Sequence, residues 1–208
     1  MLAEINHKMT CGLEDELTGN YFGMMRYLPF TRGLKPVLEK YLRSEDSQVG
    51  NVIAGMTEDV SAFTFWKRSG LGLGEIDAYM ENTGTAVGIE VKYHSDLSGE
   101  NQLEREAAML NEWNKTGDKL LIFVAPEEEA ANVYQRNKGK ACFQTVHLAY
   151  ITWQDILLGM DAVITNTVFE EQMVEDLRQY LSGKGFASFK GFASADLPVD
   201  GGLYYEFG

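Results

Sequence analysis

The stretch that decides the fold is EIDAYMENTGTAVGIEVK, residues 75–92. β-branched and aromatic residues occur in both halves, and the Asn-Thr-Gly at 82–84 is a turn signal between them. We therefore expect a β-hairpin that folds symmetrically about this turn. In that register Asp77 stands opposite Glu90, and Lys92 lies on the same side of the sheet because strand side chains alternate.

Two carboxylates in that position repel each other. Directly opposite side chains lie about 5 Å apart, and two like charges at that distance repel by roughly 3 kcal/mol in a partly screened environment. Mg²⁺ binds one or two carboxylates and keeps several waters. Such a cation between the two carboxylates would turn their net repulsion into a net attraction. A Glu-x-Lys tripeptide alone is expected about once by chance in a chain of this composition. An ordinary salt-bridged hairpin therefore stays open as the alternative to a metal site.

The composition of the chain indicates one globular domain. A length of 208 residues suits a single α/β domain, and 45% hydrophobic residues exclude a disordered chain. No apolar run is long enough to span a membrane, and the N-terminus has no signal-peptide pattern. Cys11 and Cys142 match no metal spacing, so we expect free thiols in a reducing compartment and a cytoplasmic protein. We assign residues 1–194 to the domain and 195–208 to a C-terminal tail.

The net charge is strongly acidic. With 18 basic and 31 acidic residues the formal charge is −13, which argues against a broad basic surface for nucleic acid. A small local basic groove stays compatible with this charge. Acidic residues in the helical segments, Glu104, Glu106 and Glu112 among them, are expected on solvated helix faces.

The order of the predicted elements favours an α/β fold in which helices flank a central mixed β-sheet. Besides the hairpin, hydrophobic periodicity predicts helices at 13–28, 35–42, 100–113, 127–137, 153–159 and 167–181, and strands at 60–68, 119–124 and 146–152. Ser98 is the expected N-cap of the helix that follows the hairpin. A GFAS sequence occurs twice within 185–194. Its phenylalanines are expected to pack on the core, with a base-stacking platform as the alternative.

At this point the chain resembles the PD-(D/E)XK nuclease superfamily. The resemblance rests on Asp77, on Glu90-Val91-Lys92, on Glu14 in the helix before the hairpin and on Gln102 in the helix after it. It covers residues 14–150 and implies a restriction-endonuclease-like fold. More narrowly, EDELTGNYFGMMRYLP, GIEVKY, NQLERE and KGFASFKGF are similar to segments of a group of bacterial members.

The resemblance implies a metal site. Asp77 and Glu90 match the two acids that bind the metal, and the backbone carbonyl of Val91 often joins them. The proline that usually precedes the first acid is replaced by Ile76. Glu14 matches an acid that the first helix often contributes.

The assignments of Glu14 and Gln102 leave alternatives open. Asp15 could replace Glu14 as the first-helix acid, and Glu14 could be only an acid favoured by the helix dipole. Lys92 matches the lysine that orients the attacking water or stabilises developing charge, a role in chemistry rather than in packing. Gln102 matches a polar residue that supports the site, with an exposed helix residue as the alternative.

The implied activity is hydrolysis of phosphodiester bonds in nucleic acid, more often DNA than RNA, with Mg²⁺ or Mn²⁺ as cofactor. Because the chain is so acidic, a homo-oligomer or a protein partner would supply the basic surface. The alternative function is a catalytically silent nuclease-fold module that acts in assembly or sensing with a protein partner. A third reading is an unrelated α/β protein with a fortuitous hairpin.

Overall fold

The computed structural model describes residues 13–59, 63–93 and 101–187. Five strands form one sheet in sequence order, so every strand pairs with its neighbours along the chain. The first three strands pair antiparallel and the last three parallel, which confirms the expected mixed sheet within an α/β fold. The strands are β1 Thr64–Arg68, β2 Glu75–Asn82, β3 Thr85–Val91, β4 Lys119–Ala125 and β5 His147–Thr152.

The hairpin has the register that the sequence predicts. β2 and β3 pair from Ala78↔Ile89 to Asn82↔Thr85. At the turn Thr83 and Gly84 have φ values of 49° and 78°, and a two-residue hairpin turn with both φ values positive matches the right-handed twist of its strands. The turn therefore fixes which residues of β2 and β3 face each other.

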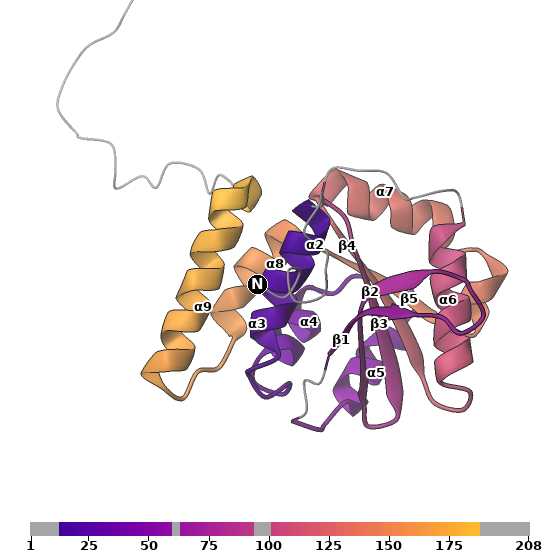
Figure 1. Cartoon of the computed structure of the whole chain (residues 1–208), viewed down its shortest axis with the longest axis horizontal. Coiled ribbons are helices and arrows are strands. Elements are labelled where there is room, and N and C mark those ends of the chain that lie inside the picture. The colour runs from indigo at the N-terminus through magenta and orange to yellow at the C-terminus, as the bar shows by residue number, and fades with distance from the viewer. Residues whose placement is uncertain (1–12, 60–62, 94–100, 188–208) are drawn as a thin grey trace, which may run out of the picture.

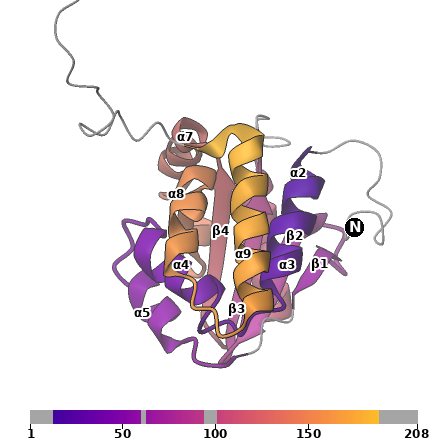
Figure 2. The same cartoon turned by 90° about the vertical axis from the view of Figure 1, so that its left-hand side faces the viewer.

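One face of the sheet carries most of the helices (Figure 2). Buried aliphatic and aromatic side chains from these helices meet alternate residues of the strands there and form the larger hydrophobic core. The helical elements on this face are α2 Leu13–Leu17, η1 Thr18–Phe22, α3 Gly23–Met25, α4 Leu34–Tyr41, α5 Val49–Gly55, α8 Trp153–Gly159, η3 Met160–Ala162, α9 Val168–Leu181 and η4 Ser182–Phe186.

The opposite face is covered by α6 Gln102–Trp113 and α7 Glu127–Asn137 (Figure 1), with the short η2 Ala141–Gln144 between α7 and β5. α6 lies very close to β3 at Gly88. A Cβ atom at Gly88 would stand 2.4 Å from Cδ1 of Ile76 and 3.2 Å from Cδ2 of Leu110. A larger residue there would force the side chain of Ile76 to move, and the close packing brings α6 against β3.

Several predicted boundaries need correction. The expected helix at 13–28 becomes π-helical over η1 and leaves regular helix after Met25. α5 was not predicted, because its sequence VGNVIAG contains two glycines, which have poor helix propensity. The helix is stabilised instead by the burial of its side chains Val49, Val52 and Ile53.

Other predictions fall partly or wholly outside the described residues. They are the start of the strand at 60–68, the N-cap Ser98, the second GFAS sequence and the boundary between 194 and 195. In the structure the N-cap of α6 is Asn101. Within the described ranges, no helix is long and apolar enough to cross a membrane.

Candidate functional site

A polar pocket of about 270 Å³ lies between the end of the hairpin and the first turns of α6. It brings together four of the side chains that the sequence assigns to a site, because Asp77, Glu90, Lys92 and Gln102 all line it. Its other lining residues are Leu73, Gly74, Glu75, Arg105, Glu106 and Met109. Antiparallel pairing of β2 with β3 supplies the two acids, and the close packing of α6 supplies the helix residues.

Asp77 stands where the regular ladder between β2 and β3 ends. The last ladder pair is Ala78↔Ile89. Beyond it, the backbone N–H of Val91 donates to Oδ2 of Asp77 at 2.8 Å. Continuation of the same register would pair Val91 with Ile76, so the Asp77 carboxylate takes the acceptor position of a backbone carbonyl. The carboxylate is thereby held in place at the pocket wall.

Trp66 on the edge strand β1 has strained backbone geometry next to Asp77. Its φ is 49°, an unusual value for a bulky residue. Such a conformation costs of order 1–3 kcal/mol and persists only because the surrounding structure enforces it. The pairs on either side of it, Phe65↔Ala78 and Lys67↔Ile76, are regular. The indole Nε1 of Trp66 donates to Oδ1 of Asp15 at 2.9 Å. This contact holds a first-helix acid close enough to influence the pKa of Asp77.

Lys92 is the buried cation of the site. Its Nζ lies 2.8 Å from Oε1 of Glu90 and 3.4 Å from Oε2 of Glu14. Lys92 is 6% exposed and Glu90 2% exposed. The expectation that Lys92 has no structural role is therefore wrong, because loss of its charge would leave Glu90 buried without its cation.

Glu14 is placed beside Lys92 but does not line the pocket. Its Oε1 also accepts a hydrogen bond of 3.3 Å from the backbone N–H of Tyr93. Glu14 therefore anchors the segment that follows β3. Val91 is fully buried, and its backbone N–H is the group that holds Asp77.

Two residues one helical turn apart on α6 face the pocket. Gln102 donates through Nε2 to Oε1 of Glu90, so its side chain orients that carboxylate. Glu106 follows four residues later on the same helix face and is 1% exposed. The expectation that Glu106 is a solvated acid is therefore wrong. Its i, i+4 spacing from Gln102, on the face that also carries Leu103 and Leu110, is the sequence signal that could have revealed it.

The Glu106 carboxyl is buried and has no hydrogen-bond partner within residues 13–59, 63–93 and 101–187. It lies close enough to Glu90 and Gln102 for both to influence its pKa. Among the described residues no group donates a hydrogen bond of good geometry to it, and both of its oxygens are unsatisfied. A buried acid without a partner is costly, so such a group in a native protein calls for a functional explanation.

Burial dominates the electrostatics of three of the four pocket acids, Asp77, Glu90 and Glu106. Removal from bulk water raises the pKa of Glu106 to about 8. The pKa of Glu90 is raised well above its ordinary value by burial and then by Glu106. The pKa of Asp77 is raised likewise by burial and then by Glu90. Burial would lower the pKa of Lys92, but Glu90 and Glu14 together hold it above its ordinary value.

The donor set suits a hard divalent cation. In the described part of the chain, no group of three or more His, Cys, Asp or Glu side chains is already arranged to hold a metal ion. Mg²⁺ requires fewer protein ligands than that, because one or two carboxylates with waters and substrate phosphate suffice. Asp77 and Glu90 supply those oxygens, and the unsatisfied oxygens of Glu106 indicate that the pocket lacks positive charge. The residues therefore fit the cation that the sequence predicts.

The opposite helical layer supports the backbone at Lys92. Nε1 of Trp153 donates to the carbonyl oxygen of Lys92 at 2.9 Å. The ring of Phe186 stacks on Trp153 with centroids 5.5 Å apart, which confirms that this phenylalanine packs on the core. Phe189 and Phe192 lie outside the described residues.

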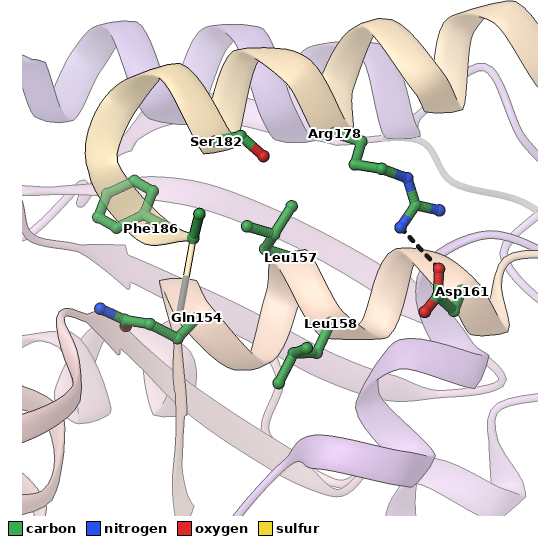
Figure 3. Close-up of a pocket in the computed structure, with 8 residues that line it drawn as sticks. Gln154, Leu157, Leu158, Asp161, Arg178, Ser182 and Phe186 are labelled. Carbon is green, nitrogen blue, oxygen red and sulfur yellow. Dashed lines mark hydrogen bonds and ion pairs between the residues drawn. The ribbon is translucent and has the colours of Figure 1, made fainter. Parts of the chain in front are cut away.

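A second cavity, of about 160 Å³, lies between α8 and η4 and is lined partly by Phe186 (Figure 3). Figure 3 shows Arg178 pointing across its rim to Asp161, with Nη1 2.6 Å from Oδ1. The carboxylate of Asp161 is therefore already neutralised by Arg178. Among the described residues that line this cavity Asp161 is the only carboxylate, so the acidic pocket beside α6 is the stronger candidate site.

Comparison of the chain with protein-family models, curated proteins and solved structures found no match. Any functional conclusion therefore depends on the residues of the pocket themselves.

Proposed function

We propose that the protein is a metal-dependent nuclease that hydrolyses phosphodiester bonds of nucleic acid, with DNA as the preferred substrate. The observation that supports it is the meeting of Asp77, Glu90 and Lys92 in one pocket, from two strands of a hairpin. A buried carboxylate, a partly buried carboxylate and a lysine together match the needs of metal-assisted phosphodiester hydrolysis. The resemblance to the PD-(D/E)XK nuclease superfamily, with its restriction-endonuclease-like fold, assigns the same residues to that chemistry.

In this proposal Asp77 and Glu90 bind Mg²⁺ or Mn²⁺ through carboxylate oxygens, with the carbonyl of Val91 as a further ligand. Once bound, the cation supplies a Lewis acid for a phosphate oxygen and lowers the pKa of a bound water. The hydrogen bond from the Val91 N–H keeps Asp77 oriented. The amide of Gln102 keeps Glu90 oriented.

Lys92 supplies positive charge where the transition state gains negative charge. Preorganised charge in a pocket shielded from water is worth more than the same charge in solvent. Glu14 holds the ammonium group from the side of α2. The indole of Trp153 fixes the backbone of Lys92 from behind. Lys92 is therefore positioned before substrate arrives.

The acidity of the chain affects how substrate would bind. A formal charge of −13 leaves little basic surface for phosphate contacts, which contribute much of the affinity for nucleic acid. Arg105 at the pocket is one local source of positive charge. A second copy of the chain or a protein partner would supply the rest.

A second candidate function is a nuclease-fold module that does not cleave and acts in assembly or sensing with a protein partner. The ion pairs of Lys92 with Glu90 and Glu14 favour it, since these contacts already neutralise part of the pocket. In such a module the buried lysine would be structural.

A cleavage assay separates the two functions. Purified protein is incubated with plasmid DNA, single-stranded DNA and RNA in Mg²⁺, Mn²⁺, Ca²⁺ or chelator. A nuclease cleaves with Mg²⁺ or Mn²⁺ and not with Ca²⁺ or chelator, and Lys92→Met abolishes cleavage. Lys138→Met is the matched control, because Lys138 pairs with Glu45 at the surface. Absence of cleavage under every condition would support the silent module.

A further inference from the structure

We propose that Glu106 becomes a third cation-binding carboxylate when a divalent cation enters the pocket, so that the cation binds before nucleic acid arrives. Among the described residues the three carboxylates are not already arranged as a ligand group, so Glu106 has to turn toward the cation. This inference rests on the proposed function, because it concerns the same pocket. It goes beyond that function because Asp77 and Glu90 alone would make a site that substrate phosphate must complete.

The first argument is burial without a partner. Glu106 is 1% exposed, and both of its carboxylate oxygens lack a hydrogen-bond partner in the described part of the chain. It belongs to the lining of the pocket that holds Asp77 and Glu90. An ionised carboxylate in such a position needs a cation or donors to offset its desolvation. A divalent cation bound in the pocket would provide that compensation.

The second argument is the geometry of α6. Gln102 and Glu106 are one helical turn apart and lie on one face, so both side chains reach the end of β3. Gln102 already contacts Glu90 through its amide. Glu106 lines the same pocket as Glu90. The helix therefore presents a hard oxygen ligand beside a carboxylate already oriented for the cation.

The third argument is the balance of charge around the pocket. Four carboxylates line it, those of Glu75, Asp77, Glu90 and Glu106, against the two lining cations Lys92 and Arg105. Glu75 is paired with Arg68 at 3.1 Å, so the excess lies with the other three acids. Lys92 is shared between Glu90 and Glu14, a fifth carboxylate from outside the lining. The negative charge is therefore in excess, and carboxylate oxygens select hard cations such as Mg²⁺ and Mn²⁺.

The test is Mn²⁺ binding to the intact chain without nucleic acid, measured by isothermal titration calorimetry at pH 8. We expect the parent to bind Mn²⁺ and Glu106→Gln to bind it about tenfold more weakly or worse, as for loss of a group that holds or orients a metal. Glu104→Gln is the matched control on the same helix, because Glu104 pairs with Lys140 at 2.7 Å. That control should bind Mn²⁺ like the parent.

Two results would overturn the inference. One is equal Mn²⁺ affinity of Glu106→Gln and the parent, and the other is Mn²⁺ binding by the parent only after nucleic acid is added. The parent could bind Mn²⁺ tightly, and Glu106→Gln weakly, while the parent cleaves no substrate. That outcome would uphold the inference and reject the nuclease function. Circular dichroism checks that each variant is folded, and glutamine matches the volume of the acid it replaces.

Discussion

The carboxylate of Asp77 accepts a hydrogen bond from the backbone N–H of Val91 at 2.8 Å, one step beyond the last regular pair of the hairpin. One side chain therefore has two roles. It ends the ladder by satisfying a backbone donor that would otherwise lack a partner, and it presents a carboxylate to the pocket. Substitutions at Asp77 can separate these roles, because asparagine keeps an acceptor oxygen and alanine does not.

In chelator at pH 8 we expect Asp77→Asn to be at least as stable as the parent, because it removes the repulsion from Glu90 and keeps an acceptor for Val91. Asp77→Ala should be less stable than Asp77→Asn by about 1–3 kcal/mol, the cost of an unsatisfied buried donor. Urea denaturation measures both free energies of unfolding. Equal stability of the two variants would show that the hydrogen bond to Val91 is not needed.

Removal of Lys92 should destabilise the protein as well as inactivate it. Lys92→Met leaves Glu90 buried without its cation, and removal of one partner of a buried ion pair costs about 3–5 kcal/mol. Addition of Glu90→Gln to Lys92→Met should recover much of that loss, because the buried negative charge is removed. A double-mutant cycle by urea denaturation at pH 8 measures the coupling. If the free energy of unfolding of Lys92→Met lay within about 0.5 kcal/mol of that of the parent, the burial argument would be contradicted.

The metal-free protein should lose stability as pH rises above the ordinary carboxyl range. Glu106 has a pKa of about 8 when folded against an ordinary value of 4.5, so the folded state binds its proton more tightly than the unfolded chain. Stability is therefore highest below pH 4.5 for this group and falls by about 1.4 kcal/mol per pH unit until pH 8. Glu90 and Asp77 contribute with the same sign.

Glu106→Gln should flatten that slope and be more stable than the parent at pH 8 in chelator. Urea denaturation from pH 5 to pH 9 measures the slope. Glu104→Gln is the control and should keep the slope of the parent. An unchanged slope in Glu106→Gln would contradict a raised pKa for Glu106.

The pair of Arg32 and Glu170 predicts the opposite behaviour at acid pH. Its two hydrogen bonds, of 3.0 and 3.1 Å, connect the segment before α4 to the start of α9, and Arg32 lowers the pKa of Glu170 to about 2. A lowered pKa stabilises the fold above the ordinary carboxyl value and loses that effect as pH falls toward 2.

The melting temperature of Arg32→Met should therefore fall below that of the parent at pH 7, with the difference shrinking between pH 5 and pH 2. Arg136→Met, at an exposed position of α7, controls for loss of a charge. A difference that does not depend on pH would rule out the carboxyl pKa as its cause.

The sequence predicts the hairpin well because the information is local. The turn at 82–84 and the alternation of the flanking strands determine the register, and the apolar run of β4 identifies a buried strand. α5 is different, since its two glycines disfavour a helix and only packing of Val49, Val52 and Ile53 stabilises it. Such packing depends on distant parts of the chain and is invisible to a local pattern.

The candidate site shows the same limit. Asp77, Glu90 and Lys92 follow from strand periodicity, because the hairpin alone brings them together. Glu106 was assigned to solvent, since acids on helices are usually exposed. Its burial arises from the close approach of α6 to Gly88, a contact between elements that the sequence pattern does not specify.

The measurement that tests the nuclease proposal most directly is the initial rate of plasmid nicking in Mg²⁺ by the parent and by Asp77→Asn. The substitution removes one charge from a metal-binding carboxylate and keeps the acceptor for Val91, so its effect reports on chemistry rather than on folding. We predict nicking by the parent that stops in chelator, and a rate for Asp77→Asn at least about a hundredfold lower. No nicking by the parent, or equal rates for the two proteins, would contradict the proposal.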